Sequence, residues 1–423
     1  TQICEESFDS CRELTTFEKS FLSTREKIQF AVEVSKPELI PKLIKNFEYY
    51  IPGFHLKLED TKYVYQDNPI TLHEIPKSIK TARDACEYIS KIDYEFEDTL
   101  SIISANENLV AVSVSHMACD GGFFIDIFDK LLLDDQYPLK SIFPLTTGHV
   151  LQDELSKVTK SEIQEYQKSK CNLTTLKWSD NFKELRKNVT ENTLCKYLVD
   201  ETAAKDFQFI KSKISLNDSY MANYALSMMA LNDNLDSNFG MATCVDMRQL
   251  MDPKDRNPSN SQNFTDMYVL AQNVTPKMTI REVAKLFRQD LNQKLKNGCI
   301  FTAYQSHFDS DFVYDSKNTS NADISNIGRF KTDNENTKFI TDTWIQTKNQ
   351  AIGAEGFVGL VLFSREKNGV NTLVTRIQQP CSVINDRDAK ILMNSLMHLM
   401  KEAPVDISIQ EAYDELRRFQ RTQ

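Results

Sequence analysis

His116 is the residue of this sequence best placed to carry out acid–base chemistry. It follows an apolar run, residues 109–115, whose pattern predicts a strand, and Gly121 and Gly122 come shortly after it. An imidazole titrates near neutral pH, so it can take a proton from a hydroxyl or an amine without large tuning. Asp120 lies four residues beyond the histidine. We therefore predict a catalytic side chain that is presented from a rigid strand end beside a sharp turn.

The elements around His116 support this placement. Residues 123–132 are largely apolar and predict a helix directly after the two glycines. The other five histidines lack a comparable setting; they are His55, His73, His149, His307 and His398. An ordinary core histidine beside a turn carboxylate is the alternative interpretation.

Residues 116–121 (His-Met-Ala-Cys-Asp-Gly) resemble the His-x-x-x-Asp-Gly motif of the CoA-dependent acyltransferase superfamily. That superfamily includes chloramphenicol acetyltransferase, fungal alcohol acetyltransferases and the condensation domains of peptide synthetases. Residues 245–248 (Val-Asp-Met-Arg) and 325–328 (Ser-Asn-Ile-Gly) resemble two later segments of the last two groups. The Asp-Phe-Gly-Trp-Gly motif of plant BAHD acyltransferases is missing. The resemblance is therefore closest to the alcohol acetyltransferase and condensation-domain branch.

The resemblance implies a role for each motif residue. His116 would be the general base, and Asp120, the second residue assigned to the catalytic motif, would form a salt bridge with a distant arginine, which we take to be Arg248. A solvated turn position is the alternative for Arg248. Cys119 as an acyl-accepting nucleophile is a weaker alternative, because nothing in the sequence indicates a lowered thiol pKa.

Donors for a tetrahedral oxyanion come from two places in the sequence. Ser325 and Asn326 would lie on a strand that closes the reaction channel, and a plain strand-and-turn role is their alternative. Gly121 and Gly122 would support the site and offer backbone N–H groups. For the phosphates of CoA, the helix predicted over residues 280–297 offers a basic face, with a solvated surface as the alternative reading; its residues are Arg281, Lys285 and Arg288.

The resemblance implies an α/β fold of two chloramphenicol-acetyltransferase-like halves. Each half would be a mixed β-sheet flanked by helices, with the active-site channel between them. Residues 1–160 would form the first half with the motif, residues 161–190 a polar connection, and residues 191–423 the second half with the crossover strand. Hydrophobic periodicity predicts strands at 27–34, 54–58, 99–103, 109–115, 193–199, 240–248 (running into a turn), 356–363 and 372–377. It predicts helices at 37–51, 206–213, 219–231, 280–297 and 386–401.

Composition limits the other function classes. The net charge of −10 argues against general nucleic-acid binding, which requires a basic surface. No apolar run is long enough for a transmembrane helix. Nine cysteines without a Cys-x-x-Cys pair favour a reducing, cytoplasmic setting, with peripheral contact to endomembranes or lipid droplets left open. The acidic start lacks the features of a secretory signal, although a chain that begins with Thr1 leaves a removed leader open.

Other chemistries lack their motifs. The sequence contains no Walker loop, no dinucleotide-binding fingerprint, no Gly-x-Ser-x-Gly elbow and no metal-ligand spacing. We therefore expect a monomeric enzyme of EC 2.3.1 type that transfers an acyl group from acyl-CoA, its co-substrate, to a small-molecule alcohol or amine. Acetyl is the acyl group we expect first. The transfer would be direct, without a metal or a permanently bound cofactor. The alternatives are a carrier-protein-dependent, condensation-like enzyme that forms esters or amides, and a catalytically degenerate binding protein of the same fold.

Overall fold

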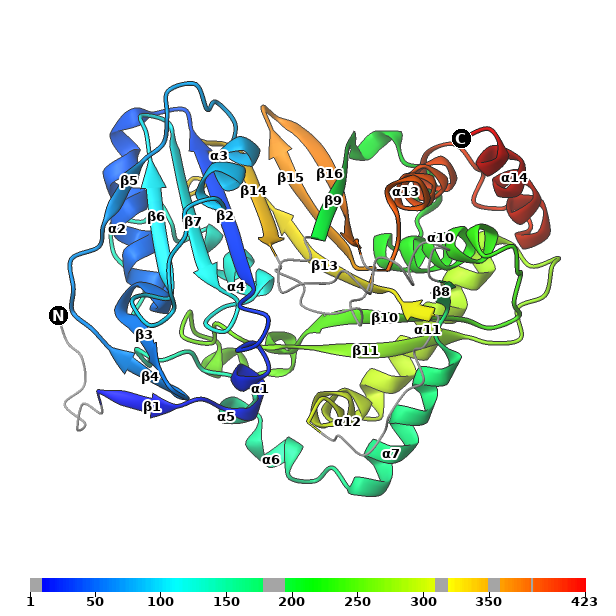
Figure 1. Ribbon diagram of the computed structural model, residues 1–423, viewed down its shortest axis with the longest axis horizontal. Coiled ribbons are helices and arrows are strands. Elements are labelled where there is room, and N and C mark those ends of the chain that lie inside the picture. Colours follow the sequence, from blue (N-terminus) through cyan, green and yellow to red (C-terminus); the bar gives the residue numbers. More distant parts are fainter. Residues whose placement is uncertain (1–9, 178–194, 309–318, 349–357, 382) are drawn as a thin grey trace.

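The computed structural model describes residues 10–177, 195–308, 319–348, 358–381 and 383–423. Two mixed β-sheets lie next to each other, and helices pack against each of them (Figure 1). Each sheet has a hydrophobic core of its own. The predicted α/β fold of two sheet-and-helix halves is confirmed.

The first sheet has five strands, and its central strands are buried on both faces. The strands in spatial order are β14 (Ile340–Lys348), β2 (Lys27–Val34), β7 (Leu109–Ser115), β6 (Ser101–Ala105) and β5 (Leu72–Glu74). Every residue of β7 is buried, which explains its nearly continuous apolar sequence. The helices of this half are α2 (Ile40–Tyr50), α3 (Ala82–Ile89) and α4 (Gly121–Phe128).

The second sheet has six strands and holds most of the second half. Its spatial order is β11 (Phe264–Ala271), β10 (Phe239–Asp246), β13 (Asp323–Phe330), β15 (Leu360–Lys367), β16 (Val370–Pro380) and β9 (Cys195–Ala203). The helices are α9 (Gln208–Ser212), α10 (Leu216–Leu231), α11 (Ile280–Lys296), α12 (Cys299–Ser306), α13 (Asp386–Lys401) and α14 (Ile409–Arg421). Of these, α10, α11, α12 and α13 contact the sheet, and α14 packs on α10 and α13 (Figure 1).

Strand β14 crosses from the second half into the first sheet. It pairs antiparallel with β2, so that Trp344 lies opposite Ala31. The segment with Ser325 and Asn326 lies on β13 and stays in the second sheet, between β10 and β15. The crossover strand is therefore β14, whereas the family resemblance suggested the segment around Ser325. The first sheet is incomplete without the second half.

Two buried arginines of the second sheet bind to this crossover strand. Arg365 of β15 is fully buried and donates from Nε to Oδ1 of Asp342 on β14 over 2.6 Å. Arg376 of β16 donates from Nη1 to the carbonyl of Thr347 over 2.7 Å. Burial lowers the pKa of Arg376, because the charged guanidinium is removed from water. These contacts hold the two sheets together along β14.

Smaller elements complete the chain. One small sheet consists of β1 (Cys11–Glu13), β4 (Lys62–Tyr65) and β3 (Leu56–Glu59), and another of β12 (Thr319–Asn321) and β8 (Thr175–Lys177). The remaining helices are α1 (Thr16–Lys19), α5 (Thr147–Val150), α6 (Gln152–Leu155) and α7 (Lys160–Lys168). The predicted connection, residues 161–190, contains most of α7 and all of β8; its residues 178–190 lie outside the described part of the chain. Leu151, Leu155 and Tyr166 pack into the core of the second half.

The element predictions vary in accuracy. The helix predicted at 386–401 has these bounds in α13, and Thr279 and Glu282 form the capping box expected at the start of α11. Residues 193–194 and 356–357 of two predicted strands lie outside the described residues. Helix α14 was not predicted, although Ser408 and Glu411 form a capping box at its start.

Candidate active site

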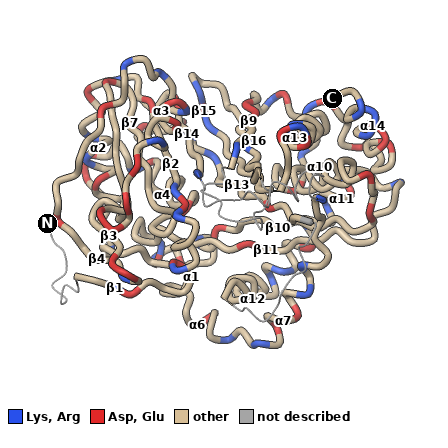
Figure 2. The backbone as a smooth tube through the Cα atoms, in the orientation of Figure 1, with Lys and Arg blue, Asp and Glu red and all other residues tan. Residues whose placement is uncertain are grey.

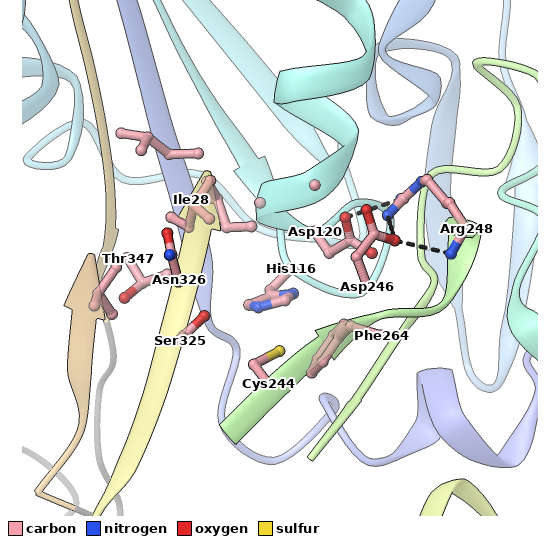
Figure 3. Close-up of a pocket in the computed structure, with 15 residues that line it drawn as sticks. Ile28, His116, Asp120, Cys244, Asp246, Arg248, Phe264, Ser325, Asn326 and Thr347 are labelled. Carbon is pink, nitrogen blue, oxygen red and sulfur yellow. Dashed lines mark hydrogen bonds and ion pairs between the residues drawn. The ribbon is translucent and has the colours of Figure 1, made fainter. Parts of the chain in front are cut away.

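A cavity of about 90 Å³ lies between the two sheets at the end of β7. Its walls come from both halves of the chain (Figure 3). The lining residues are Ile28, His116, Asp120, Gly121, Gly122, Cys244, Asp246, Arg248, Phe264, Ser325, Asn326, Ile327, Ile345, Thr347 and Val361. The sequence-predicted residues of the three motifs are therefore brought together around one cavity.

His116 lies immediately after β7, and its backbone is fixed from two sides. Its N–H donates to the carbonyl of Glu26 over 2.8 Å, and its own carbonyl accepts a hydrogen bond from the side chain of Gln262. The ring is half-buried and faces the cavity (Figure 3). Nδ1 is buried and has no hydrogen-bond partner within the described residues. Nε2 is thus the nitrogen available to a ligand.

Both carboxylate oxygens of Asp120 accept hydrogen bonds from other protein groups, so neither is free to bind His116. Oδ1 accepts from the N–H of Phe123 over 2.8 Å, which caps α4, and from Nη2 of Arg248 over 2.9 Å. Oδ2 accepts from the N–H of Asn263 over 2.6 Å. This geometry gives Asp120 a structural function at the turn and leaves it no free oxygen for proton transfer.

The ion pair between Asp120 and Arg248, which the resemblance implied, is present and buried. The side chain of Arg248 is 9% exposed and that of Asp120 is 4% exposed. Arg248 also binds Asp246 over 3.0 Å and the carbonyl of Asn260 over 2.8 Å. Burial alone would lower the pKa of Arg248, because it disfavours the charged guanidinium. The carboxylates of Asp120 and Asp246 together have the larger, opposite effect, so the pKa of Arg248 is raised. Arg248 therefore links β10 to the start of α4.

The two motif glycines permit close approach at the start of α4. A Cβ atom on Gly121 would lie 3.0 Å from Cγ1 of Ile327, and one on Gly122 would lie 2.8 Å from Nη1 of Arg248. Larger residues would push α4 away from the second sheet. The first N–H groups of a helix have no partner within it, so those of Gly121 and Gly122 remain available beside the cavity.

Ser325 and Asn326 both line the cavity but differ in what they can donate. The Asn326 side chain is already bound, because its Nδ2 donates to Oδ1 of Asn217 over 2.7 Å and its Oδ1 accepts from the N–H of Gly328 over 3.0 Å. Ser325 faces the cavity near Cys244 (Figure 3). Ser325 is thus the stronger candidate to donate to a ligand.

The thiols at the site are not activated. Burial raises the pKa of Cys119 well above its usual value, and the Asp120 carboxylate adds to the effect. Burial likewise raises the pKa of Cys244. A thiolate nucleophile is disfavoured at both positions. No three His, Cys, Asp or Glu side chains in the described ranges come together as a metal site.

The basic residues predicted for CoA phosphates lie on α11 and do not line the cavity. Arg281 is paired with Asp406 over 2.7 Å, and Arg288 is paired with Asp218 over 2.9 Å. Lys285 is exposed. A role for Arg281, Lys285 and Arg288 in cofactor binding stays a prediction.

The residues around His116 that were not identified from the sequence include two phenylalanines and a glutamine. Phe21 stacks on the His116 ring, Phe264 lies on the cavity wall, and Gln262 binds the His116 carbonyl. None of them lies in a motif, and each reaches the histidine from a distant part of the chain. The sequence holds no local signal that would have found them.

Solved structures with the same fold are found at low sequence identity. Polyketide synthase associated protein 5 from Mycobacterium tuberculosis is 14% identical with a TM-score of 0.64, over 93% of this chain and 98% of that chain. A trichothecene 15-O-acetyltransferase from Fusarium sporotrichioides is 10% identical with a TM-score of 0.60, over 95% of each chain. A mutant starter condensation domain of the rhizomide synthetase, in complex with C8-CoA, is 8% identical with a TM-score of 0.62, over 95% of this chain and 97% of that chain.

These likenesses extend over nearly the whole chain and show that it shares the fold of these proteins, which is the fold that the sequence resemblance implied. They include one acetyltransferase and several condensation domains, so they do not single out the alcohol acetyltransferase branch. No family model matches the sequence, and no curated protein matches it. Among the described residues, no helix combines the length and the apolar character needed to cross a bilayer.

Proposed function

We propose that the chain is an acyltransferase that moves an acyl group from a CoA thioester to the hydroxyl or amine of a small acceptor. The observation that carries the proposal is the half-buried imidazole of His116, which faces a cavity built from both sheets. Its Nε2 would take the proton from the acceptor as the acceptor attacks the thioester carbonyl. The collapse of the tetrahedral intermediate would then release the CoA thiolate, which the protonated imidazole can reprotonate.

The surroundings of His116 suit this reaction. The start of α4 carries the positive end of the helix dipole and two free N–H groups, at Gly121 and Gly122, beside the cavity. The side chain of Ser325 on β13 also lines the cavity (Figure 3). These donors would stabilise the oxyanion of the tetrahedral intermediate. Two fold neighbours, a trichothecene acetyltransferase and a condensation domain in complex with C8-CoA, support acyl-CoA as the donor.

The test uses the full chain with acetyl-CoA and longer acyl-CoAs against a panel of alcohols and amines. Thiol release gives the rate, and mass spectrometry identifies the acylated product. His116→Ala should lower kcat about 10²–10⁴-fold while the circular dichroism spectrum stays unchanged. His73→Ala, on β5 away from the cavity, is the matched control and should keep full activity.

The alternatives give different outcomes in the same assay. A carrier-dependent condensation-like enzyme would act on acyl-pantetheine carrier thioesters and not on acyl-CoA. A degenerate binding protein would release no thiol with any donor, and its ligand affinity would not depend on the imidazole. Wild-type turnover that His116→Ala leaves intact would refute the assignment of the general base.

A further inference from the structure

The imidazole of His116 is held by aromatic rings instead of a hydrogen-bonded carboxylate. The ring of Phe21 stacks on it with centroids 4.8 Å apart and planes at 24°, and the ring of Phe264 lies 5.6 Å away at 41°. Nδ1 is buried without a hydrogen-bond partner in the described part of the chain. Both oxygens of Asp120 are occupied by other groups. No hydrogen bond from Asp120 or to Nδ1 therefore orients the ring.

The path of the backbone explains how Phe21 reaches the histidine. Glu26, directly before β2, accepts the N–H of His116, so the two segments run side by side at this point. Arg25 has a φ of 43°, in the left-handed region, and this conformation reverses the chain. The N–H of Arg25 donates to the carbonyl of Phe21 over 3.2 Å, which closes the turn. The chain thus folds back and places the phenyl ring over the imidazole.

The segment that carries Phe21 is itself well anchored. Thr15 and Glu18 form a capping box at the start of α1, and Glu18, which is fully buried, is paired with Arg12. Phe17 stacks on Tyr304 with centroids 5.5 Å apart, which ties the segment to the second half. Phe21 therefore rests on a rigid support.

We propose that Phe21 is a positioning residue, whose ring holds the His116 imidazole in the orientation that aims Nε2 into the cavity. A catalytic histidine is commonly oriented by a hydrogen bond to its second nitrogen, and here stacking takes over that task. The ring face also attracts the imidazolium that forms during transfer. Losing one such aromatic contact corresponds to about a 2- to 10-fold loss of kcat. The kinetic part of this inference rests on the proposed function, whereas the placement of the ring does not.

The placement is tested by NMR on the full chain with ¹⁵N- and ¹³C-labelled histidine. The His116 signals are assigned by their loss in His116→Gln. Phe21→Leu should remove the part of the ring-current shift of the imidazole protons that Phe21 causes, while the part from Phe264 remains, and Phe21→Trp should retain a shift from a ring at position 21. The matched control is a second stack, His398 on Phe419, with centroids 4.8 Å apart at 13°. Phe419→Leu should move the His398 signals and leave those of His116 in place.

The function of the stack is tested by the kinetics of the same variants. Phe21→Leu should lower kcat with KM changed by less than about twofold, because the ring acts on the base and not on ground-state binding. Phe21→Trp should restore kcat, and Phe419→Leu should match the wild type. Unchanged His116 signals or an unchanged kcat in Phe21→Leu would overturn the inference, as would a loss of kcat that Phe21→Trp fails to restore. If the NMR shifts follow expectation but no acyl-CoA supports turnover, the proposed function falls while the placement of the ring by Phe21 stands.

Discussion

Replacing Asp120 with Asn and Arg248 with Met, singly and together, measures how strongly the buried ion pair stabilises the site. Asn at position 120 keeps an oxygen for the N–H of Phe123, so the helix cap survives, whereas the charge and the acceptor for the N–H of Asn263 are lost. Met at position 248 keeps the length of the side chain and removes the guanidinium. Exchanging the two charged residues would be a poorer test, because an arginine at position 120 could not cap α4 or accept from Asn263.

The structure sets the expected size of each effect. Arg248→Met leaves a 4% exposed carboxylate with only backbone donors, and breaking a buried pair in this way costs about 3–5 kcal/mol of unfolding free energy. Asp120→Asn weakens the hydrogen bond to Arg248 and leaves the N–H of Asn263 without its acceptor, and it should cost about 1–3 kcal/mol. In the double variant neither charge is left unpaired. The two changes should therefore couple by about 1–3 kcal/mol.

Urea unfolding followed by far-ultraviolet circular dichroism gives the four free energies of the cycle. The thiol-release assay on the same proteins tests whether the pair also holds the turn in its active geometry, in which case Asp120→Asn lowers kcat more than it raises KM. Additive free energies, within about 0.5 kcal/mol, would show that Asp120 and Arg248 act independently and would refute the reasoning.

Two further predictions concern packing and pH. Gly122→Ala would place a Cβ 2.8 Å from Nη1 of Arg248 and should lower the free energy of unfolding in urea by about 1–3 kcal/mol. In the control Gly148→Ala the atom nearest to the new Cβ would lie 3.6 Å away, so the free energy of unfolding should hardly change. Equal losses in the two variants would contradict the close-approach argument. Burial and the nearby Asp266 carboxylate raise the pKa of Asp323 to about 7, so the stability contributed by its bound proton is present below about pH 4 and is lost as the pH rises to about 7. Asp323→Asn should therefore lose less stability between those pH values than the wild type does, and parallel urea midpoints would contradict this.

The central part of the site could be predicted from the sequence because its signals are local. The strand before His116, the glycines after it and the helix beyond them all lie within one continuous segment, and Asp120 caps that helix. Asp120 and Arg248 are far apart in the chain, and no periodicity or spacing relates them; the resemblance alone suggested the pair that the structure contains.

The rest of the site depends on long-range pairing, which a single sequence does not encode in any local pattern. Phe21 reaches His116 only because the turn before β2 lies beside the end of β7. Asn326 was predicted as a donor, yet its amide is bound by Asn217, a residue at the start of α10 that no motif includes. Propensity and spacing predict elements, whereas such partners follow from the tertiary fold.

The crossover of β14 makes the two halves one structural unit, and the site depends on this. Ile345 and Thr347 on β14 form part of the cavity wall, although they follow β13 of the second sheet in the chain. The same strand is bound from the second sheet by Arg365 and Arg376. Figure 2 shows basic and acidic residues on elements of both halves, including strands at this seam. A fully buried arginine at such a seam is costly unless its partner stays in place. Movement of one sheet against the other would therefore break the Arg365–Asp342 ion pair and, in the same motion, open the cavity wall that β14 forms. The contacts that hold the halves together thus also maintain the geometry around His116.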